Sequence, residues 1–220
     1  MEIIIVTGRN KEEEIIPAPI EQTIHFNVEG VDGLEDITAT PGETIELPTP
    51  ERTGYTFVEW RDAEENGNVV EWITMPTLES GATEITLYGV WSANEYTITY
   101  KDEGGEDYSG TNVSLLPTTH TYGTPTELVD GVKGGYEFIG WFDNPECSGE
   151  RVETLGATAY TSNITLYAKW EELEVFNVTE EGQLTGLTSY GQTLEEVIIP
   201  SEVNGVAVTS IANNAFQNNQ

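Results

Sequence analysis

Two nearly identical seven-residue stretches constrain this chain more than any other feature. "GYTFVEW" occupies residues 54–60, and "GYEFIGW" occupies residues 135–141. Both stretches begin with Gly-Tyr, carry Phe in the middle and end on Trp. The repetition is either a site that is used twice or one piece of a duplicated structural unit. The two explanations give the aromatic residues different roles.

Further matches in the same order indicate that a whole unit is duplicated. The matching blocks are "QTIHF" (22–26) with "YTITY" (96–100), "PGETIEL" (41–47) with "YGTPTEL" (122–128), and "ITLYGVW" (85–91) with "ITLYAKW" (164–170). Differences in spacing fall between the blocks, where loops are expected. Self-similarity of this kind is the signature of a repeat architecture. We therefore expect two tandem modules, at residues 21–92 and 93–171.

Alternating side chains predict that each block is a β-strand. Ile85, Leu87 and Trp91 share one face of their block, and the second copy keeps the same three residue types. It places Lys169 where the first copy has Val90, so the Ile-Leu-Trp face is the inner one. Neither module shows a convincing helical period. The expected fold class is mostly β, α+β at most, with two β-grasp-like repeat modules.

Four of the five tryptophans occupy matching strand ends, namely Trp60, Trp91, Trp141 and Trp170. These residues repeat together with their alternating aliphatic partners, as the residues of a duplicated core would. A module of roughly 70 residues is close to the lower limit for an independent core, so large aromatic residues are needed to bury enough area. Trp72 has no counterpart in the second module. It is the candidate for an exposed ring that stacks on a ligand.

Taken together, these blocks resemble the Listeria–Bacteroides repeat, also called the internalin B-repeat. Its hallmarks are the element G-Y-x-F-x-G-W and a terminal L-Y-A-x-W. The second copy matches more closely, because the first has Glu59 for the heptad's second Gly and Gly89 for Ala. The resemblance implies a small β-grasp-like module, repeated in tandem on bacterial surface and secreted proteins. It implies no catalytic residues and no cofactor.

The pattern changes from about Val175 onward. The stretch "VIIPSEVNGVAVTSIANNAF" (197–216) resembles the opening of a BspA-type leucine-rich repeat. Residues 172–220 would then be the start of a leucine-rich-repeat region, and residues 1–20 a leader or linker. A solenoid repeat buries its apolar face only against neighbouring repeats. We therefore expect a truncated array that continues in a longer protein, with self-association through the uncovered residues Leu194, Ile199, Ile211 and Phe216.

The charge balance excludes two classes of partner. The chain has 39 acidic and 8 basic residues, for a formal charge of −31. Such a surface repels phosphate backbones and anionic lipid headgroups, so we expect no nucleic acid and no membrane partner. No apolar run approaches the roughly 20 residues of a membrane helix. The amino-terminal stretch lacks the basic region of a signal peptide, so the expected cell-surface or extracellular location follows from the resemblance alone.

Few residues qualify for chemistry. Cys147 is the sole cysteine, so it cannot form an internal disulfide, and only His25 and His120 could activate it as a nucleophile. No nucleotide-binding, zinc-protease or serine-hydrolase motif is present. The loop "KDEGGEDYSGTN" (101–112) offers hard oxygen ligands that suit Ca²⁺, although their spacing is not that of an EF-hand. A solvated loop is the preferred interpretation of these four acids, Asp102, Glu103, Glu106 and Asp107.

The sequence thus predicts a non-catalytic piece of a bacterial cell-surface or secreted protein. The two modules would form a stalk or spacer that presents a leucine-rich region, and this region would bind a protein or glycan ligand. The alternative is a carbohydrate-binding module that uses Trp72 and other exposed rings. No cofactor is expected, and Ca²⁺ is the weaker alternative.

Overall fold

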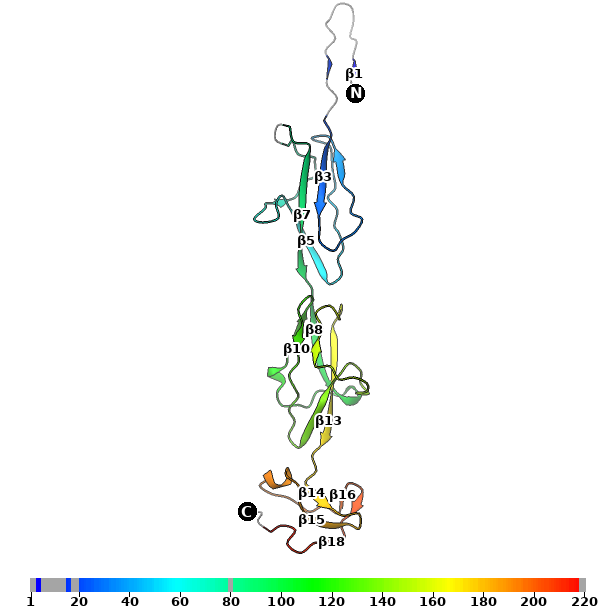
Figure 1. Ribbon diagram of the computed structural model, residues 1–220, viewed down its shortest axis with the longest axis vertical. Coiled ribbons are helices and arrows are strands. Elements are labelled where there is room, and N and C mark those ends of the chain that lie inside the picture. Colours follow the sequence, from blue (N-terminus) through cyan, green and yellow to red (C-terminus); the bar gives the residue numbers. More distant parts are fainter. Residues whose placement is uncertain (1–2, 5–14, 17–19, 79–80, 218–220) are drawn as a thin grey trace, which may run out of the picture. The chain divides into compact units, whose positions relative to one another are not determined.

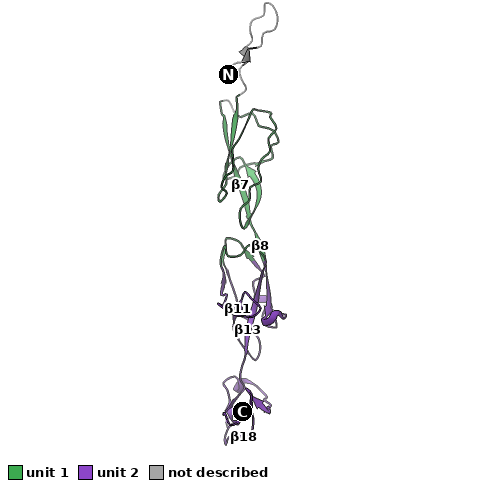
Figure 2. Ribbon diagram, turned by 90° about the vertical axis from the view of Figure 1, so that its right-hand side faces the viewer, with its two compact units in different colours: residues 1–96, 120–125, 156–162 green, residues 97–119, 126–155, 163–220 purple. Residues whose placement is uncertain are grey.

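The computed structural model describes residues 3–4, 15–16, 20–78 and 81–217 (Figure 1). The chain divides into two compact units, residues 1–96, 120–125 and 156–162 in the first and residues 97–119, 126–155 and 163–220 in the second (Figure 2). The expected leader or linker, residues 1–20, lies largely outside the described residues. Within it, β1 (Ile3–Ile4) pairs antiparallel with β2 (Ile15–Ile16).

The first repeat forms a five-stranded sheet in the order β4-β3-β7-β5-β6. The central pair β3 and β7 is parallel, whereas β3–β4, β5–β6 and β5–β7 are antiparallel. The first Gly-Tyr heptad supplies β5, and "ITLYGVW" supplies β7. The strands are β3 (Gln22–Asn27), β4 (Ile37–Ala39), β5 (Tyr55–Arg61), β6 (Val69–Val70) and β7 (Glu84–Ala93).

One face of this sheet carries the first core. Leu87 and Ile24 are fully buried, and Trp60 is 3% exposed. Ile24 lies opposite Ile85 across the parallel pair. The partly buried residues Phe57 and Trp72 pack against the same cluster, whose buried members are Ile24, Ala39, Ile45, Trp60, Val70, Met75 and Leu87. The predicted inner face of "ITLYGVW" is therefore the buried one.

The second repeat reproduces this pattern in a four-stranded sheet of order β11-β13-β8-β9. Ile98 faces Ile164 across its parallel pair, as Ile24 faces Ile85 in the first repeat. The strands β10 and β12 of the second repeat form a separate, two-stranded antiparallel sheet. The elements are β8 (Glu95–Asp102), η1 (Glu103–Gly105), η2 (Val113–Leu115), β9 (Thr119–Thr121), β10 (Thr126–Glu127), β11 (Tyr136–Phe142), β12 (Thr154–Leu155) and β13 (Ile164–Glu172).

One predicted strand is wrong. The block "PGETIEL" at 41–47 forms no strand, and only Thr44 makes an isolated bridge, to Thr74. A turn occupies its start, where Gly42 has a φ of 86°. Pro48 follows the block and cannot donate a ladder hydrogen bond. The equivalent block of the second repeat keeps just the two-residue strand β10.

The carboxyl-terminal segment, residues 175–217, has its own small core of Phe176, Leu184 and Val203. Its sheet runs β14-β15-β18, and β15 pairs in parallel with β18, so that Leu184 lies opposite Ile211. The intervening residues contain the hairpin of β16 and β17. The elements are β14 (Phe176–Val178), β15 (Gln183–Leu187), η3 (Gly191–Thr193), β16 (Glu202–Val203), β17 (Val206–Ala207) and β18 (Ser210–Ile211).

The fold class is mostly β, as predicted. The described part of the chain contains three short 3-10 turns and no α-helix. It accordingly holds no helix with the length and apolar character needed to cross a membrane.

Candidate functional site

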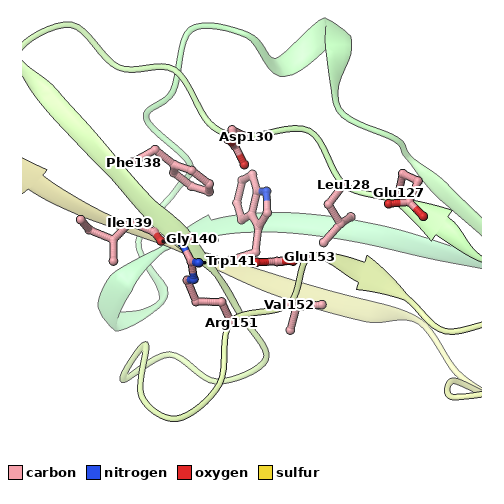
Figure 3. A pocket seen from close by; sticks show the side chains of 10 residues that line it. All are labelled: Glu127, Leu128, Asp130, Phe138, Ile139, Gly140, Trp141, Arg151, Val152 and Glu153. Carbon is pink, nitrogen blue, oxygen red and sulfur yellow. Dashed lines mark hydrogen bonds and ion pairs between the residues drawn. The ribbon is translucent and has the colours of Figure 1, made fainter.

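The second repeat contains an open groove of about 430 Å³ beside β11 (Figure 3). Three chain segments form its walls: the end of β10 and the residues after it, the middle of β11, and the residues before β12. Carboxylates, an arginine and an indole therefore line one hollow. The lining residues are Glu127, Leu128, Asp130, Phe138, Ile139, Gly140, Trp141, Arg151, Val152 and Glu153.

A β-bulge in β11 shapes this groove. Phe138 pairs with Trp170 and Gly140 with Lys169, so Ile139 has no partner in the ladder. A bulge of this kind redirects the side chains that follow it. Trp141 comes next and is 1% exposed, and its indole Nε1 donates to the carbonyl of Val129 at 2.9 Å.

The side chain of Arg151 fills one edge of the groove. Its Nη1 donates to the carbonyl oxygen of Ile139 at 2.9 Å, and its Nη2 lies 3.5 Å from Oε1 of Glu153. Gly140 leaves the necessary space, because a Cβ there would lie 2.5 Å from Cδ of Arg151. The guanidinium of Arg151 thus bridges the carbonyl of Ile139, at the bulge, and the carboxylate of Glu153.

The first repeat has a groove of about 390 Å³ at the equivalent place. Its strand β5 is bulged at Val58, which has no ladder partner, and Nε1 of Trp60 donates to the carbonyl of Pro48 at 2.8 Å. Both grooves therefore share two features. Each has a β-bulge in its central strand, and each has a tryptophan whose indole N–H donates to a backbone carbonyl. The lining residues are Leu47, Pro48, Thr49, Phe57, Val58, Glu59, Trp60, Val69, Val70, Glu71 and Trp72.

The two grooves differ at the position of the arginine. Val70 pairs with Trp60 as Val152 pairs with Trp141, so Val69 stands in the place of Arg151. Glu71 likewise stands in the place of Glu153. The first groove is consequently lined by an aliphatic residue where the second is lined by a guanidinium.

Glu59 replaces the heptad's second glycine in the first repeat. Its carboxylate Oε1 accepts a hydrogen bond from Nε of Arg61 at 2.7 Å. The Arg61 guanidinium also donates from Nη1 to the carbonyl of Gly67 at 3.3 Å. The guanidinium of Arg61 therefore already makes hydrogen bonds to Glu59 and Gly67. Arg61 does not line the groove.

The tryptophans fall into two groups. Trp60 and Trp141 are buried, which confirms the prediction that they belong to the cores. Trp72 is half-buried, packs against the first core and lines the first groove. Trp91 and Trp170 are also half-buried. Trp170 donates to Asp102, whereas Nε1 of Trp91 has no hydrogen-bond partner among the described residues.

The acidic loop of the second repeat is engaged by local donors. Asp102 accepts from Nε1 of Trp170 at 2.8 Å and from the Ser109 backbone N–H at 3.2 Å. Asp107 lies 3.2 Å from Nζ of Lys101, and Glu103 lies 3.9 Å from Nζ of Lys169. Among the residues that the structure describes, no three His, Cys, Asp or Glu groups converge as a metal site would require.

Cys147 and His120 are buried, whereas His25 is half-exposed. Cys147 is buried, and burial together with the nearby Glu103 raises its pKa to about 11, so little thiolate forms near neutral pH. His120 is buried, and burial lowers its pKa. His25 is half-exposed, and its Nδ1 lies 2.8 Å from a carboxylate oxygen of Asp36.

Sequence reasoning missed both grooves. A signal for them is present, because a Val-Glu pair recurs at residues 70–71 and 152–153. The spacing from the heptad to this pair differs by one residue between the copies. The pairing of each Val with a groove tryptophan shows that the two pairs correspond.

These features define a class of protein, a tandem pair of small β modules built on one duplicated pattern with a groove in each copy. The family model of the Listeria-Bacteroides repeat domain matches residues 23–90 and 96–169. The chain belongs to this repeat family.

Curated relatives match about two thirds of this chain. Internalin H of Listeria monocytogenes is 34% identical over 145 residues, which cover 64% of this chain and 24% of that protein. A protein of Evansella cellulosilytica, provisionally named a membrane protein, is 31% identical over 157 residues, which cover 68% of this chain and 22% of that protein. The chain thus spans about a quarter or less of the length of these relatives.

Proposed function

We propose that this chain is a non-catalytic part of a bacterial surface protein, in which the two repeats act as a spacer. The observation that carries the proposal is the pair of successive repeats of the Listeria-Bacteroides family, at residues 23–90 and 96–169. The similarity of Internalin H to 64% of this chain supports it. Each repeat buries its own tryptophan, as a spacer module that folds around its own core would.

The carboxyl-terminal segment is proposed to begin a leucine-rich recognition region for a protein or glycan ligand. Parallel pairing of β15 with β18 supports this proposal, because Leu184 and Ile211 face each other from strands 27 residues apart in the chain. Strands of successive solenoid coils pair in this way. Ile199 and Ile211 are 41% and 50% exposed, so an apolar surface is available for a following coil or a ligand.

Labelling of intact cells tests the surface assignment. Antibodies raised against the purified chain should bind intact cells of the bacterium that encodes it, and mild external proteolysis should remove the signal. Binding that appears only after lysis would contradict the proposal. An antibody against a cytoplasmic protein of the same cells is the control for leakage.

Carbohydrate binding is the second candidate function. The observation that favours it is that Trp72 is half-buried along an open groove, so part of its ring remains accessible. A glycan array probed with the whole chain should give a signal that Trp72→Ala removes. If the recognition region lies in further leucine-rich repeats, the chain should bind no glycan on the array.

A further inference from the structure

We propose that the Gly-Tyr turn that opens each heptad is a docking site for a tyrosine of the module that follows it in the chain. The turn consists of Gly54 and Tyr55 in the first repeat and of Gly135 and Tyr136 in the second. The partner of each repeat is thus its tandem neighbour. This inference rests on the proposed spacer function and deepens it, because it names the contact that holds the junction between two modules closed.

The first junction is one residue long, since Asn94 alone separates β7 from β8. Three hydrogen bonds fix this residue. Its backbone N–H donates to the carbonyl of Gly54 at 2.9 Å, and its Oδ1 accepts from the hydroxyl of Thr56 at 2.6 Å. The carbonyl of Asn94 accepts from the backbone N–H of Tyr122 at 2.9 Å. Asn94 therefore connects the Gly-Tyr turn with a loop of the second repeat.

The ring of Tyr122 occupies the space that a side chain at position 54 would need. A Cβ at Gly54 would lie 2.3 Å from Cγ and Cδ1 of Tyr122. The same ring meets Tyr55 edge-on, with the ring centroids 5.5 Å apart and the planes at 80°. Aromatic pairs in this geometry stabilise a structure beyond the area that they bury. The loop comes equally close to the turn, because a Cβ at Gly123 would lie 2.9 Å from the hydroxyl oxygen of Tyr55.

The loop that carries Tyr122 belongs to the compact unit of the first repeat. Residues 120–125 and 156–162 of the second repeat are both part of that unit (Figure 2). The backbone N–H of Gly123 donates to the carbonyl of Ala157 at 2.7 Å, which joins the two loops. On the other side of the contact, the guanidinium of Arg52 lies 4.2 Å from the centroid of the Tyr55 ring. Each of the two tyrosines is therefore positioned by its own neighbours.

The second repeat has the same arrangement at its own end. Leu173 lies three residues after the last tryptophan of its repeat, as Asn94 does in the first. Its backbone N–H donates to the carbonyl of Gly135 at 2.8 Å. A Cβ at Gly135 would lie 3.3 Å from the hydroxyl oxygen of Tyr190, a residue of the carboxyl-terminal segment. The glycine of each heptad thus faces a tyrosine of the next module, through the ring in the first case and the hydroxyl in the second.

Backbone conformation alone does not account for the glycine at position 54. Gly54 has a φ of 76°, which favours glycine wherever it occurs. Gly42, in another turn of the same repeat, has a φ of 86°, and a Cβ there would meet no atom within 4 Å. Gly42 therefore satisfies only the backbone, whereas Gly54 also leaves space for the ring of Tyr122. The comparison supplies a control for backbone strain.

Hydrogen exchange of the whole chain, read by NMR at single amides, tests the proposal. Tyr122→Ala should speed the exchange of the Asn94 amide about tenfold or more, because the aromatic pair that opposes opening of the junction is lost. Tyr122→Phe keeps the ring and should leave this exchange within about twofold of the parent. The Leu173 amide, at the other junction, should be unchanged in both variants. If Tyr122→Ala accelerates only the amides of its own loop, residues 120–125, the docking site is refuted.

Tyr190→Ala is the reciprocal test at the second junction. It should speed the exchange of the Leu173 amide and leave the Asn94 amide unchanged. Its effect should be smaller than that of Tyr122→Ala, because only the hydroxyl of Tyr190 faces the glycine. An unchanged Leu173 amide in a folded Tyr190→Ala chain would contradict the claim that the docking site is repeated.

Gly54→Ala blocks the docking site from the opposite side. It should speed the exchange of the Asn94 amide about tenfold or more, whereas Gly42→Ala, which introduces backbone strain alone, should not. Gly54→Ala combined with Tyr122→Ala should add little to either single change, because both remove one contact.

An effect of the double variant as large as the product of the two single effects would overturn the proposal. If Gly54→Ala does not fold, the comparison of Tyr122→Ala with Tyr122→Phe decides. These measurements use the purified chain, so their outcome is independent of the cell-labelling test of the spacer function.

Discussion

Trp60 and Trp141 have the same surroundings in the two repeats. Their exposed fractions are 3% and 1%, and each indole N–H donates to a backbone carbonyl, of Pro48 and Val129. A buried indole whose N–H is satisfied contributes its large apolar area without leaving an unpaired donor. The tryptophan of the duplicated heptad therefore has a structural role, and it forms the floor of each groove.

The first prediction concerns this role of Trp141. Trp141→Ala should lower the free energy of unfolding by about 3–5 kcal/mol, the usual cost of removing a buried Trp or Phe side chain. Small domains are stable by only about 5–15 kcal/mol, so a large part of the second repeat's stability would be lost. Urea unfolding followed by circular dichroism measures the change. Val113→Ala, at a residue that is 58% exposed, is the control. A variant that melts like the parent would refute the core assignment.

A second pair of residues explains why the first repeat has Gly89 where the family has Ala. A Cβ at Gly89 would lie 2.4 Å from Cγ1 of Val28. The second repeat has Ala168 at the equivalent place, opposite Asp102. The side chain of Val28 therefore requires a residue without a Cβ at position 89.

The second prediction follows from this contact. Gly89→Ala should destabilise the first repeat by about 1–3 kcal/mol, the usual cost of overpacking a core. Val28→Ala in the same chain should recover most of that loss, because it removes the clashing methyl group. A double-mutant cycle measures the coupling between the two sites. Additive effects of the two substitutions would show that the contact does not determine the glycine.

His120 ties folding stability to pH, which gives the third prediction. Burial lowers the pKa of His120 in the folded chain, whereas an unfolded histidine titrates near about 6.5. The unfolded chain therefore binds the proton first as the pH falls. The free energy of unfolding should decrease as the pH drops below about 6.5, down to the folded-state pKa.

Urea titrations between pH 7.5 and 5.5 measure this dependence. His120→Gln should flatten the curve in that range, and His25→Gln, at a half-exposed histidine, is the matched control. An equal slope in the His120→Gln variant would contradict the linkage.

At the scale of single elements, the acidic loop at 102–109 is organised by hydrogen bonds within the chain. Asp102 accepts from Trp170 and from the backbone of Ser109, so part of its coordination capacity is already used. Lys101 and Lys169 lie within ion-pair distance of Asp107 and Glu103. Calcium usually takes six to eight oxygen ligands. The loop would have to rearrange to supply them.

The fourth prediction is therefore that the loop binds Ca²⁺ weakly or not at all. Calorimetry of the whole chain with millimolar Ca²⁺ should show no saturable heat that depends on Asp102 or Asp107. Mg²⁺ under the same conditions is the control for diffuse attraction to the acidic surface. A one-site isotherm that Asp107→Asn abolishes would refute this prediction.

The elements that could be predicted from the sequence are those whose pattern is repeated. The strands β5, β7, β11 and β13 follow from alternation, because their inner residues recur in both copies. The block at 41–47 was expected to be a strand for the same reason. Its proline and its turn leave only a bridge at Thr44. The alternation of apolar and polar residues indicates which face of a segment is buried. It says little about which backbone groups form hydrogen bonds in a sheet.

The grooves could not be predicted because they depend on pairing. The bulges at Val58 and Ile139 arise from register shifts that no single residue marks. Arg151 lies 12 residues from the carbonyl that it binds, in a loop of different length in the two copies. The repeat pattern shows that the two copies correspond. Only the strand register shows that Val69 of the first repeat occupies the position of Arg151 in the second.

At the scale of the whole molecule, buried residues are distributed unevenly along the chain. The first repeat buries seven hydrophobic residues in one cluster, whereas the carboxyl-terminal segment buries three. That segment also leaves Leu194, Ile199 and Ile211 at 36%, 41% and 50% exposure. The expectation that Phe216 is uncovered as well is wrong, because its ring packs against Phe176 in the small core of the segment. Local stability follows the number of buried apolar contacts. The carboxyl-terminal segment should therefore open more readily than either repeat.

The fifth prediction is that amide hydrogens from about residue 175 onward exchange faster than those of β3, β7, β8 and β13. Hydrogen exchange read by mass spectrometry on the whole chain, at low concentration to suppress self-association, measures the difference. Chain extension supplies the matched comparison, with three further copies of residues 194–220 added at the carboxyl end, so that the 27-residue offset between β15 and β18 continues. If the parallel pair of β15 and β18 is one step of a solenoid, the added coils should protect the amides of β18 and leave both repeats unchanged. Equal protection of the segment and the repeats in the unextended, monomeric chain would instead make residues 175–217 a complete domain. The argument for a leucine-rich recognition region would then lose its structural support.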